Sequence, residues 1–200
     1  SDVCSSDLHF EYYNKINKTS RESKLFDFNL PTNCHLYGVF QTAFKYHHEN
    51  MDIIKKILEQ DPKAIIVMLG LSGNPQRFSK YLEETLGFYV NRVRLLETLA
   101  TPRYHKLISC MDVILDSYPF GGCNTSLDSF NFNKIVVTMP SNKINGRFTF
   151  GFYQKMQILE PIAKLLRPLI LIDFPIAILI SSLGLSLNSR IRFLKEISVI

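Results

Sequence analysis

A short apolar run in the middle of the chain, Ala64 to Leu69, constrains the fold more than any other feature. Its six residues carry no polar side chain and are closed by Gly70, a pattern typical of a strand buried on both faces. Asp61 and Pro62 end the helix before it, because proline disfavours the helical conformation for the preceding residue. The run therefore predicts a parallel sheet with helices on both sides.

Apolar runs and helix-length segments alternate along most of the chain. We predict strands at 35–40, 64–69, 93–97, 113–115 and 135–139, and helices at 51–58, 76–86, 103–110 and from residue 124. Parallel strands need such helix-length connections, so the pattern implies repeated βαβ units. The predicted fold class is α/β, a doubly wound, Rossmann-like parallel sheet with flanking helices.

The length of 200 residues, 46% of them hydrophobic, suits one domain with its own core. We place that Rossmann-like domain at residues 31–200, and interpret residues 1–30 as a poorly defined leader or the end of a preceding domain. The very hydrophobic stretch 169–185 contains Asp173 and Pro175 and is short for a span of about 20 residues. We expect a buried helix there and an amphipathic helix at 186–200; a membrane-associated α/β protein is the alternative.

Charge and cysteine content exclude several classes of protein. The net charge of +5 is spread along the chain, which suits an anionic ligand and does not demand nucleic acid. The four cysteines form no CxxC pair and no metal-ligand spacing with the five histidines, so neither a zinc site nor a disulfide framework is expected. His47 and His48 would diverge by about 100° on a helix and are interpreted as surface residues. A reducing, cytoplasmic or nucleocytoplasmic location is expected.

The segment 116–128 follows a predicted strand, turns through Gly121 and Gly122 and enters a helix near Asn124. Backbone N–H groups at a helix start, together with the helix dipole, form a site for phosphate. The glycines would let the backbone approach a diphosphate, and Thr125 and Ser126 would add donors. A glycine turn before a helix is also a common structural device, and the sequence has neither a Walker loop nor a GxGxxG fingerprint.

Three segments, 119–130, 135–140 and 146–156, resemble in order and spacing the signature of the O-GlcNAc transferase family, glycosyltransferase family 41. Residues 41–66 and 101–105 are similar to further segments, so the resemblance covers about residues 36–160. The family has the GT-B architecture of two Rossmann-like lobes. The resemblance is to the C-terminal lobe, which holds the nucleotide-sugar donor.

The resemblance implies roles for residues that follow the first and fourth predicted strands. Lys45 is similar to the lysine that neutralises the donor phosphates and is the implied catalytic residue, with Gln41 beside the same group. Asn124 and Thr125 correspond to residues that donate hydrogen bonds to the diphosphate, and Asp128 to a carboxylate that accepts from the ribose hydroxyls. Without the resemblance, the lysine would be a solvated charge and the aspartate a carboxylate favourable to the helix dipole.

Basic residues elsewhere are further candidates. Arg103 and His105 match residues lining the nucleoside pocket, where a flat imidazole or a cation can pack against uracil. The spacing from His105 to Asp112 is one residue shorter than in the animal enzymes. Arg147 matches an arginine of the family's bacterial and plant-like branch, and either orients the following helix or approaches the donor. Arg77 is a weaker candidate after the second strand.

The implied reaction is transfer of N-acetylglucosamine from a uridine diphosphate donor to serine or threonine of a protein. The resemblance implies no cofactor and no metal, and places acceptor binding on a facing lobe or repeat region that has no counterpart here. The transferred sugar and the acceptor are not determined by the motifs. A nucleotide-sugar-binding module without catalysis is a competing interpretation.

Overall fold

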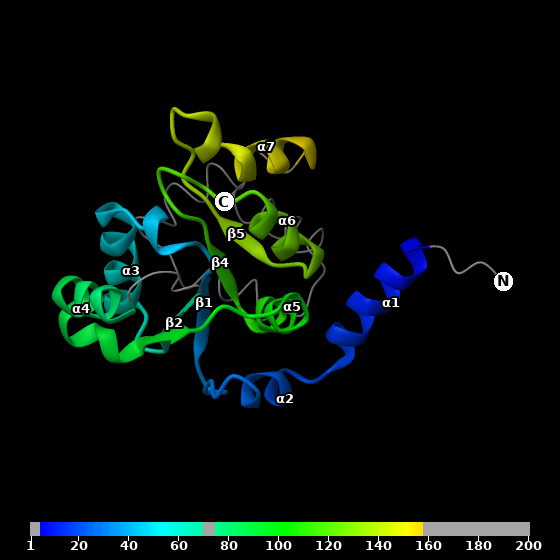
Figure 1. The fold of residues 1–200 in the computed structure, drawn as a ribbon, viewed down its shortest axis with the longest axis horizontal. Helices are drawn as coiled ribbons and strands as arrows, with labels where there is room; N and C mark the ends of the chain where they lie inside the picture. The colour runs from blue at the N-terminus through cyan, green and yellow to red at the C-terminus, as the bar shows by residue number, and fades with distance from the viewer. Residues whose placement is uncertain (1–4, 70–74, 158–200) are drawn as a thin grey trace, which may run out of the picture.

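The computed structural model describes residues 5–69 and 75–157, whose central element is a parallel sheet (Figure 1). Five strands lie in the order β3-β2-β1-β4-β5, with every neighbouring pair parallel. They are β1 His35–Val39, β2 Ala64–Leu69, β3 Val93–Leu96, β4 Val113–Leu115 and β5 Ile135–Val137. The sheet confirms the predicted doubly wound α/β fold.

Helices connect consecutive strands, as the alternation predicted. They are α3 His48–Gln60, α4 Pro75–Leu86, α5 Thr101–Cys110, α6 Asn124–Asn131 and, after the last strand, α7 Phe148–Lys155. Short 3-10 turns are η1 Ala43–Lys45, η2 Gly87–Arg92 and η3 Ile144–Gly146. No helix among the described residues is long and apolar enough to cross a membrane. The helices predicted at 169–185 and 186–200 lie outside the described residues.

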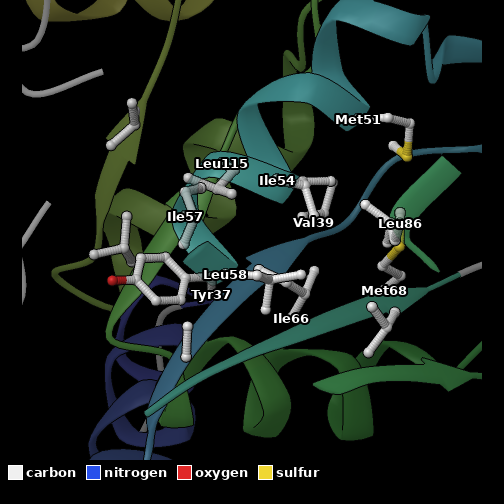
Figure 2. Packing of buried hydrophobic residues seen from close by; sticks show 14 of the residues in the cluster. Tyr37, Val39, Met51, Ile54, Ile57, Leu58, Ile66, Met68, Leu86 and Leu115 are labelled. Atoms are coloured by element: carbon white, nitrogen blue, oxygen red, sulfur yellow. The ribbon is translucent and has the colours of Figure 1, made fainter. Parts of the chain in front are cut away.

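The sheet has two covered faces, and side chains of β2 alternate between them. Ala64, Ile66 and Met68 join the cluster that α3 and α4 cover, drawn in Figure 2. The residues between them, Ile65 and Val67, point to the other face and join a second cluster, under α2 and α5. All six strand residues are buried, so helices on both faces exclude water from β2, as the uninterrupted apolar run predicted.

The N-terminal segment contributes to the second cluster. It forms α1 Ser5–Lys18 and α2 Arg21–Phe26, and α2 packs against α5. Leu25, Phe28 and Leu30 are each at most 7% exposed. The core therefore begins before residue 31, where the sequence interpretation placed the start of the domain, because these apolar side chains cover a face that would otherwise meet water.

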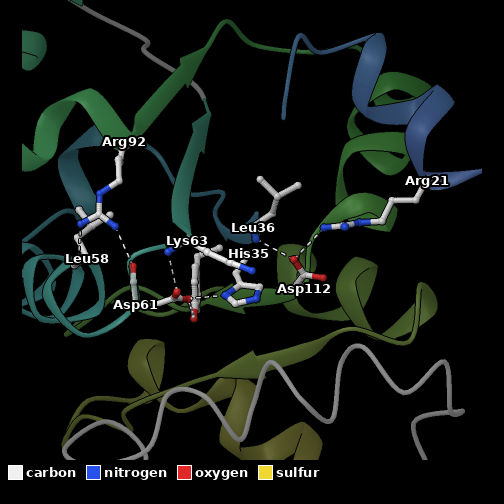
Figure 3. Close-up of polar contacts among 9 residues, drawn as sticks. Arg21, His35, Leu36, Leu58, Asp61, Lys63, Arg92 and Asp112 are labelled. Atoms are coloured by element: carbon white, nitrogen blue, oxygen red, sulfur yellow. Dashed lines mark hydrogen bonds and ion pairs between the residues drawn. The ribbon is translucent and has the colours of Figure 1, made fainter. Parts of the chain in front are cut away.

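Two carboxylates organise the amino-terminal edge of the sheet (Figure 3). Asp112 accepts hydrogen bonds from the Leu36 N–H at 2.7 Å and the Arg21 guanidinium at 2.9 Å. Asp61 accepts from the Tyr37 hydroxyl at 3.0 Å, and burial beside Asp61 raises the pKa of Tyr37, so the hydroxyl stays a neutral donor. The polar groups at this edge satisfy one another, whereas the segments at the opposite edge contain the predicted site.

We expect Ile66→Ala to lower the free energy of unfolding by about 2–5 kcal/mol, because it removes buried methyl groups and leaves a cavity. Ile66 is fully buried between β2 and its covering helices. The matched control is Phe88→Ala, since Phe88 is 81% exposed and surface changes stay within about 0.5 kcal/mol. Urea unfolding followed by circular dichroism measures both, and similar losses in the two variants would contradict the assigned core.

Candidate functional site

The candidate site lies at the carboxyl ends of β1 and β4, the two neighbouring strands at the centre of the sheet. The chain leaves β1 through α3 toward β2, and leaves β4 through α6 toward β5 on the opposite side. Such a switch point opens a crevice in doubly wound folds, because neighbouring connections diverge. Residues 40–45 and 116–125 face each other there.

A chain of hydrogen bonds joins the two connections. The Lys45 ammonium group donates to Gln41 Oε1 at 2.9 Å and to the Gly121 carbonyl at 3.2 Å. Gln41 Nε2 in turn donates to Thr125 Oγ1 at 2.7 Å. We call Lys45, Gln41 and Thr125 the polar triplet. The structure thus brings together three residues that the sequence separates by as many as 84 positions.

The charge of Lys45 is held in a partly desolvated position. Burial lowers the pKa of Lys45, and the nearby Asp116 and Cys123 act in the opposite direction. The ammonium nitrogen also lies 4.2 Å from the ring centroid of Phe120. A positive charge removed from bulk water acts more strongly on a neighbouring anion than a solvated one does.

The two glycines serve the site differently from the sequence interpretation. The Gly122 N–H donates to Asp116 Oδ1 at 2.5 Å and the Gly121 N–H to the Asn145 carbonyl at 3.1 Å, so both donors are already used within the protein. A Cβ atom on Gly122 would lie 2.3 Å from Thr125 Oγ1. Gly122 is therefore required because it leaves room for the polar triplet.

The first turn of α6 presents unused donors beside Lys45. Cys123 is the N-cap and makes no side-chain capping bond, while its carbonyl accepts from the N–H groups of Ser126 and Leu127. The N–H groups of Asn124 and Thr125 have no acceptor within residues 5–69 and 75–157, as expected at a helix start. These donors and the positive end of the helix dipole suit an anion.

Ser126 points the other way. It is 2% exposed, and its hydroxyl lies 2.7 Å from Thr149 Oγ1 inside the fold. The structure therefore places this predicted ligand contact on the inner face of the helix, since consecutive residues of a helix point in different directions.

His105 and Asp128 form a second polar pair, one helical turn beyond Thr125. His105 Nε2 and Asp128 Oδ1 lie 3.7 Å apart. His105 is 7% exposed, because Tyr12 and Tyr13 of α1 pack on its ring. The Tyr12 hydroxyl lies 3.0 Å from His105 Nδ1. The structure brings the two predicted residues together and adds a cover from α1 that the sequence did not suggest.

Two of the predicted arginines contact backbone carbonyls of other segments. Arg103 donates to the Asp27 carbonyl at 3.4 Å and lies over the Phe28 ring, on the side of α2. Arg147 donates to the Ser141 carbonyl at 3.2 Å and precedes α7. Arg77 is exposed on α4.

Asp116 is the important residue that the sequence interpretation did not single out. Its carboxylate accepts from the Gly122 N–H at 2.5 Å, the Thr138 hydroxyl at 2.9 Å and the Thr149 hydroxyl at 2.7 Å, in addition to the N–H of Ser117. Burial raises the pKa of Asp116, and these hydrogen bonds oppose that shift. The sequence feature that could have pointed to Asp116 is its position directly after a buried strand, because ligand-binding residues of such folds lie there.

One group of described side chains could share a cation. The ligand atoms of His47, His48 and Glu49 all lie within 4.8 Å of one another, and the two imidazole rings are 3.9 Å apart. The argument that adjacent histidines must diverge was wrong here, because His47 is the extended N-cap residue and α3 begins at His48. Both histidines are exposed, as predicted.

Comparison with known proteins identifies the fold. No family model and no curated protein matches the sequence. An O-GlcNAc transferase variant from Thermobaculum terrenum superposes with a TM-score of 0.59 at 21% identity, covering 84% of this chain and 36% of that one. A UDP-GlcNAc 2-epimerase from Neisseria meningitidis bound to UDP-GlcNAc gives 0.51 at 15% identity, covering 95% and 51%. HepE from Anabaena in complex with UDP and glucose gives 0.51 at 18%, covering 92% and 54%.

The described part of the chain has an α/β fold, a five-stranded parallel sheet with flanking helices, that matches GT-B glycosyltransferase structures. The chain spans between 36% and 54% of the length of the three structures. Identities of 15% to 21% establish the fold alone, so membership of the O-GlcNAc transferase family stays a prediction.

We expect Gly122→Ala to lower the free energy of unfolding by about 1–3 kcal/mol, because its methyl group would overlap Thr125 and Gln41. Gly151→Ala is the matched control: Gly151 lies within α7, and its added methyl would meet no atom of residues 5–69 and 75–157 within 4 Å. Alanine favours a helix over glycine, so this variant should gain about 0.5–1 kcal/mol. Chemical unfolding of both variants tests the packing, and a neutral Gly122→Ala would contradict it.

Proposed function

We propose that this chain is the donor-binding lobe of a glycosyltransferase, and that it holds the diphosphate of a nucleotide sugar between Lys45 and the start of α6. The observation that carries the proposal is the polar triplet, which links an ammonium group to the first turn of α6 through Gln41. An anion there would meet Lys45 on one side and the N–H groups of Asn124 and Thr125 on the other.

This arrangement suits glycosyl transfer. When the bond between sugar and diphosphate breaks, negative charge grows on the leaving diphosphate. Fixed donors that meet that charge stabilise the transition state more than the ground state. Lys45 and the first turn of α6 would supply this stabilisation, with Gln41 fixing the position of the ammonium group. The scheme calls for no divalent metal or cofactor.

The finer proposal concerns donor and acceptor. We propose UDP-N-acetylglucosamine as the donor and serine or threonine of a protein as the acceptor, on the resemblance of residues 119–156 to the O-GlcNAc transferase family. Asp128, one turn along α6 and beside His105 of α5, would face the nucleoside. We further propose that the acceptor is bound by a facing lobe or repeat region and that the protein acts in the cytoplasm or the nucleus.

A second candidate is nucleotide-sugar binding without catalysis. It is favoured by the similarity to a UDP-GlcNAc 2-epimerase, whose fold superposes over 95% of this chain. Transfer releases UDP and attaches the sugar to an acceptor, whereas simple binding leaves the nucleotide sugar intact. Incubation with UDP-N-acetylglucosamine and analysis of the products by mass spectrometry separates the two.

We expect the chain to bind UDP, and Lys45→Ala to weaken binding by about 10- to 100-fold, because a charge-assisted hydrogen bond is lost. Asn124→Ala should have a smaller effect, since the backbone N–H groups remain. Lys80→Ala is the matched control, because Lys80 is an exposed lysine on α4 that pairs with Glu84. Isothermal titration calorimetry measures all four proteins. Absence of binding tighter than the millimolar range, or equal affinity in Lys45→Ala, would contradict the proposal.

The affinity for UDP should also fall at alkaline pH. Because burial lowers the pKa of Lys45, its ammonium group is present at lower pH and loses its proton before an ordinary lysine does, whose pKa is about 10.4. Titrations between pH 7 and 10 should show a decline that is absent from Lys45→Ala, which retains any pH dependence of UDP itself. Parallel profiles for the two proteins would show that Lys45 does not contact the phosphates.

A further inference from the structure

We propose that Asp116 is a positioning residue that acts through Thr149 and Ser126 to fix the first turn of α6. The inference rests on the proposed function only in that this turn is taken to bind the diphosphate. Asp116 itself lies behind the glycine turn and is not a direct contact of the ligand in this proposal. Its role is to determine where the donors of Asn124 and Thr125 point.

The direction of the hydrogen bonds carries the argument. Asp116 Oδ2 lies 2.7 Å from Thr149 Oγ1, and an ionised carboxylate only accepts, so Thr149 donates its single hydroxyl proton to it. The Thr149 oxygen can then only accept from Ser126 Oγ, which is 2.7 Å away. The relay therefore runs from Ser126 to Thr149 to Asp116.

Burial makes this relay rigid. Ser126 and Thr149 are 2% and 1% exposed, so an unpaired hydroxyl at either position would be left without water. Ser126 holds the inner face of the helix turn, while its neighbour Thr125 binds Gln41 on the outer face. Fixing the inner face therefore sets the orientation of the outer donors.

The same carboxylate also aligns the entrance to the helix. Asp116 Oδ1 accepts the N–H groups of Ser117 and Gly122, which are the first residue of the loop and the one before the N-cap. One carboxylate thus ties both ends of the 117–122 loop to α7. In an Asp116→Asn variant, the side-chain NH₂ group would face either the two N–H donors on Oδ1 or the two threonine hydroxyls on Oδ2.

Two threonines allow a matched test, because Thr138 and Thr149 both donate to Asp116 Oδ2, but Thr149 alone of these two contacts Ser126. In the full chain we expect Thr149→Val to weaken UDP binding by about tenfold, because the hydrogen bond that positions the first turn of α6 is lost. Thr138→Val should change it by less than about twofold, since its bond does not reach α6. Thr149→Ser retains the hydroxyl and should restore the affinity.

Hydrogen exchange of the ligand-free protein gives a second readout, independent of UDP. The N–H groups of Ser126 and Leu127, which bind the Cys123 carbonyl, should exchange faster in Thr149→Val than in Thr138→Val or Thr149→Ser. Equal exchange and equal UDP affinity in the two valine variants would overturn the positioning role. If the unmutated chain binds no UDP, the proposed function fails, while the exchange comparison still decides whether the Thr149 hydroxyl, held by Asp116, fixes the first turn of α6.

Discussion

The parallel pairing of β1 with β4 is the constraint on which the rest of the structure depends. It places Tyr37 beside Val113 and Gly38 beside Ile114, joining two halves of the sheet whose helical connections run in opposite directions. Gly38 permits this contact, since a Cβ there would lie 2.8 Å from Ile114. Every contact of the candidate site follows from this pairing, because it brings the residues after β1 next to those after β4.

Polar side chains then fix the relative positions of the segments that follow β1 and β4. Gln41 connects Lys45 to Thr125, and Asp116 holds the opposite side of the same helix turn through Thr149. Partial burial strengthens the field of the ammonium group at the cost of lowering its pKa. This arrangement underlies the proposal of a diphosphate ligand, since donors and positive charge come together from two elements.

The fold was largely predictable, because it depends on periodic patterns along the sequence. The run at 64–69 predicted a strand covered on both faces, and β2 has that environment. The glycine turn predicted a helix starting at Asn124, where α6 begins. The role of Gly122 was not predictable, since its space is defined by the side chains of Gln41 and Thr125. The closeness of His47 and His48 was missed because it depends on the exact start of a helix.

The sequence by itself determined the order and type of the elements from β1 to β5, because side-chain periodicity is a local property. The glycine turn before Asn124 predicted a phosphate site, whereas Lys45 became a candidate only through the family resemblance. Only the tertiary structure decided how these residues act together: that the glycine N–H groups are used by Asp116 and Asn145, that Ser126 faces inward, and that tyrosines of α1 cover His105. Such contacts join residues far apart in the chain, so their geometry is fixed only when the sheet and its helices pack.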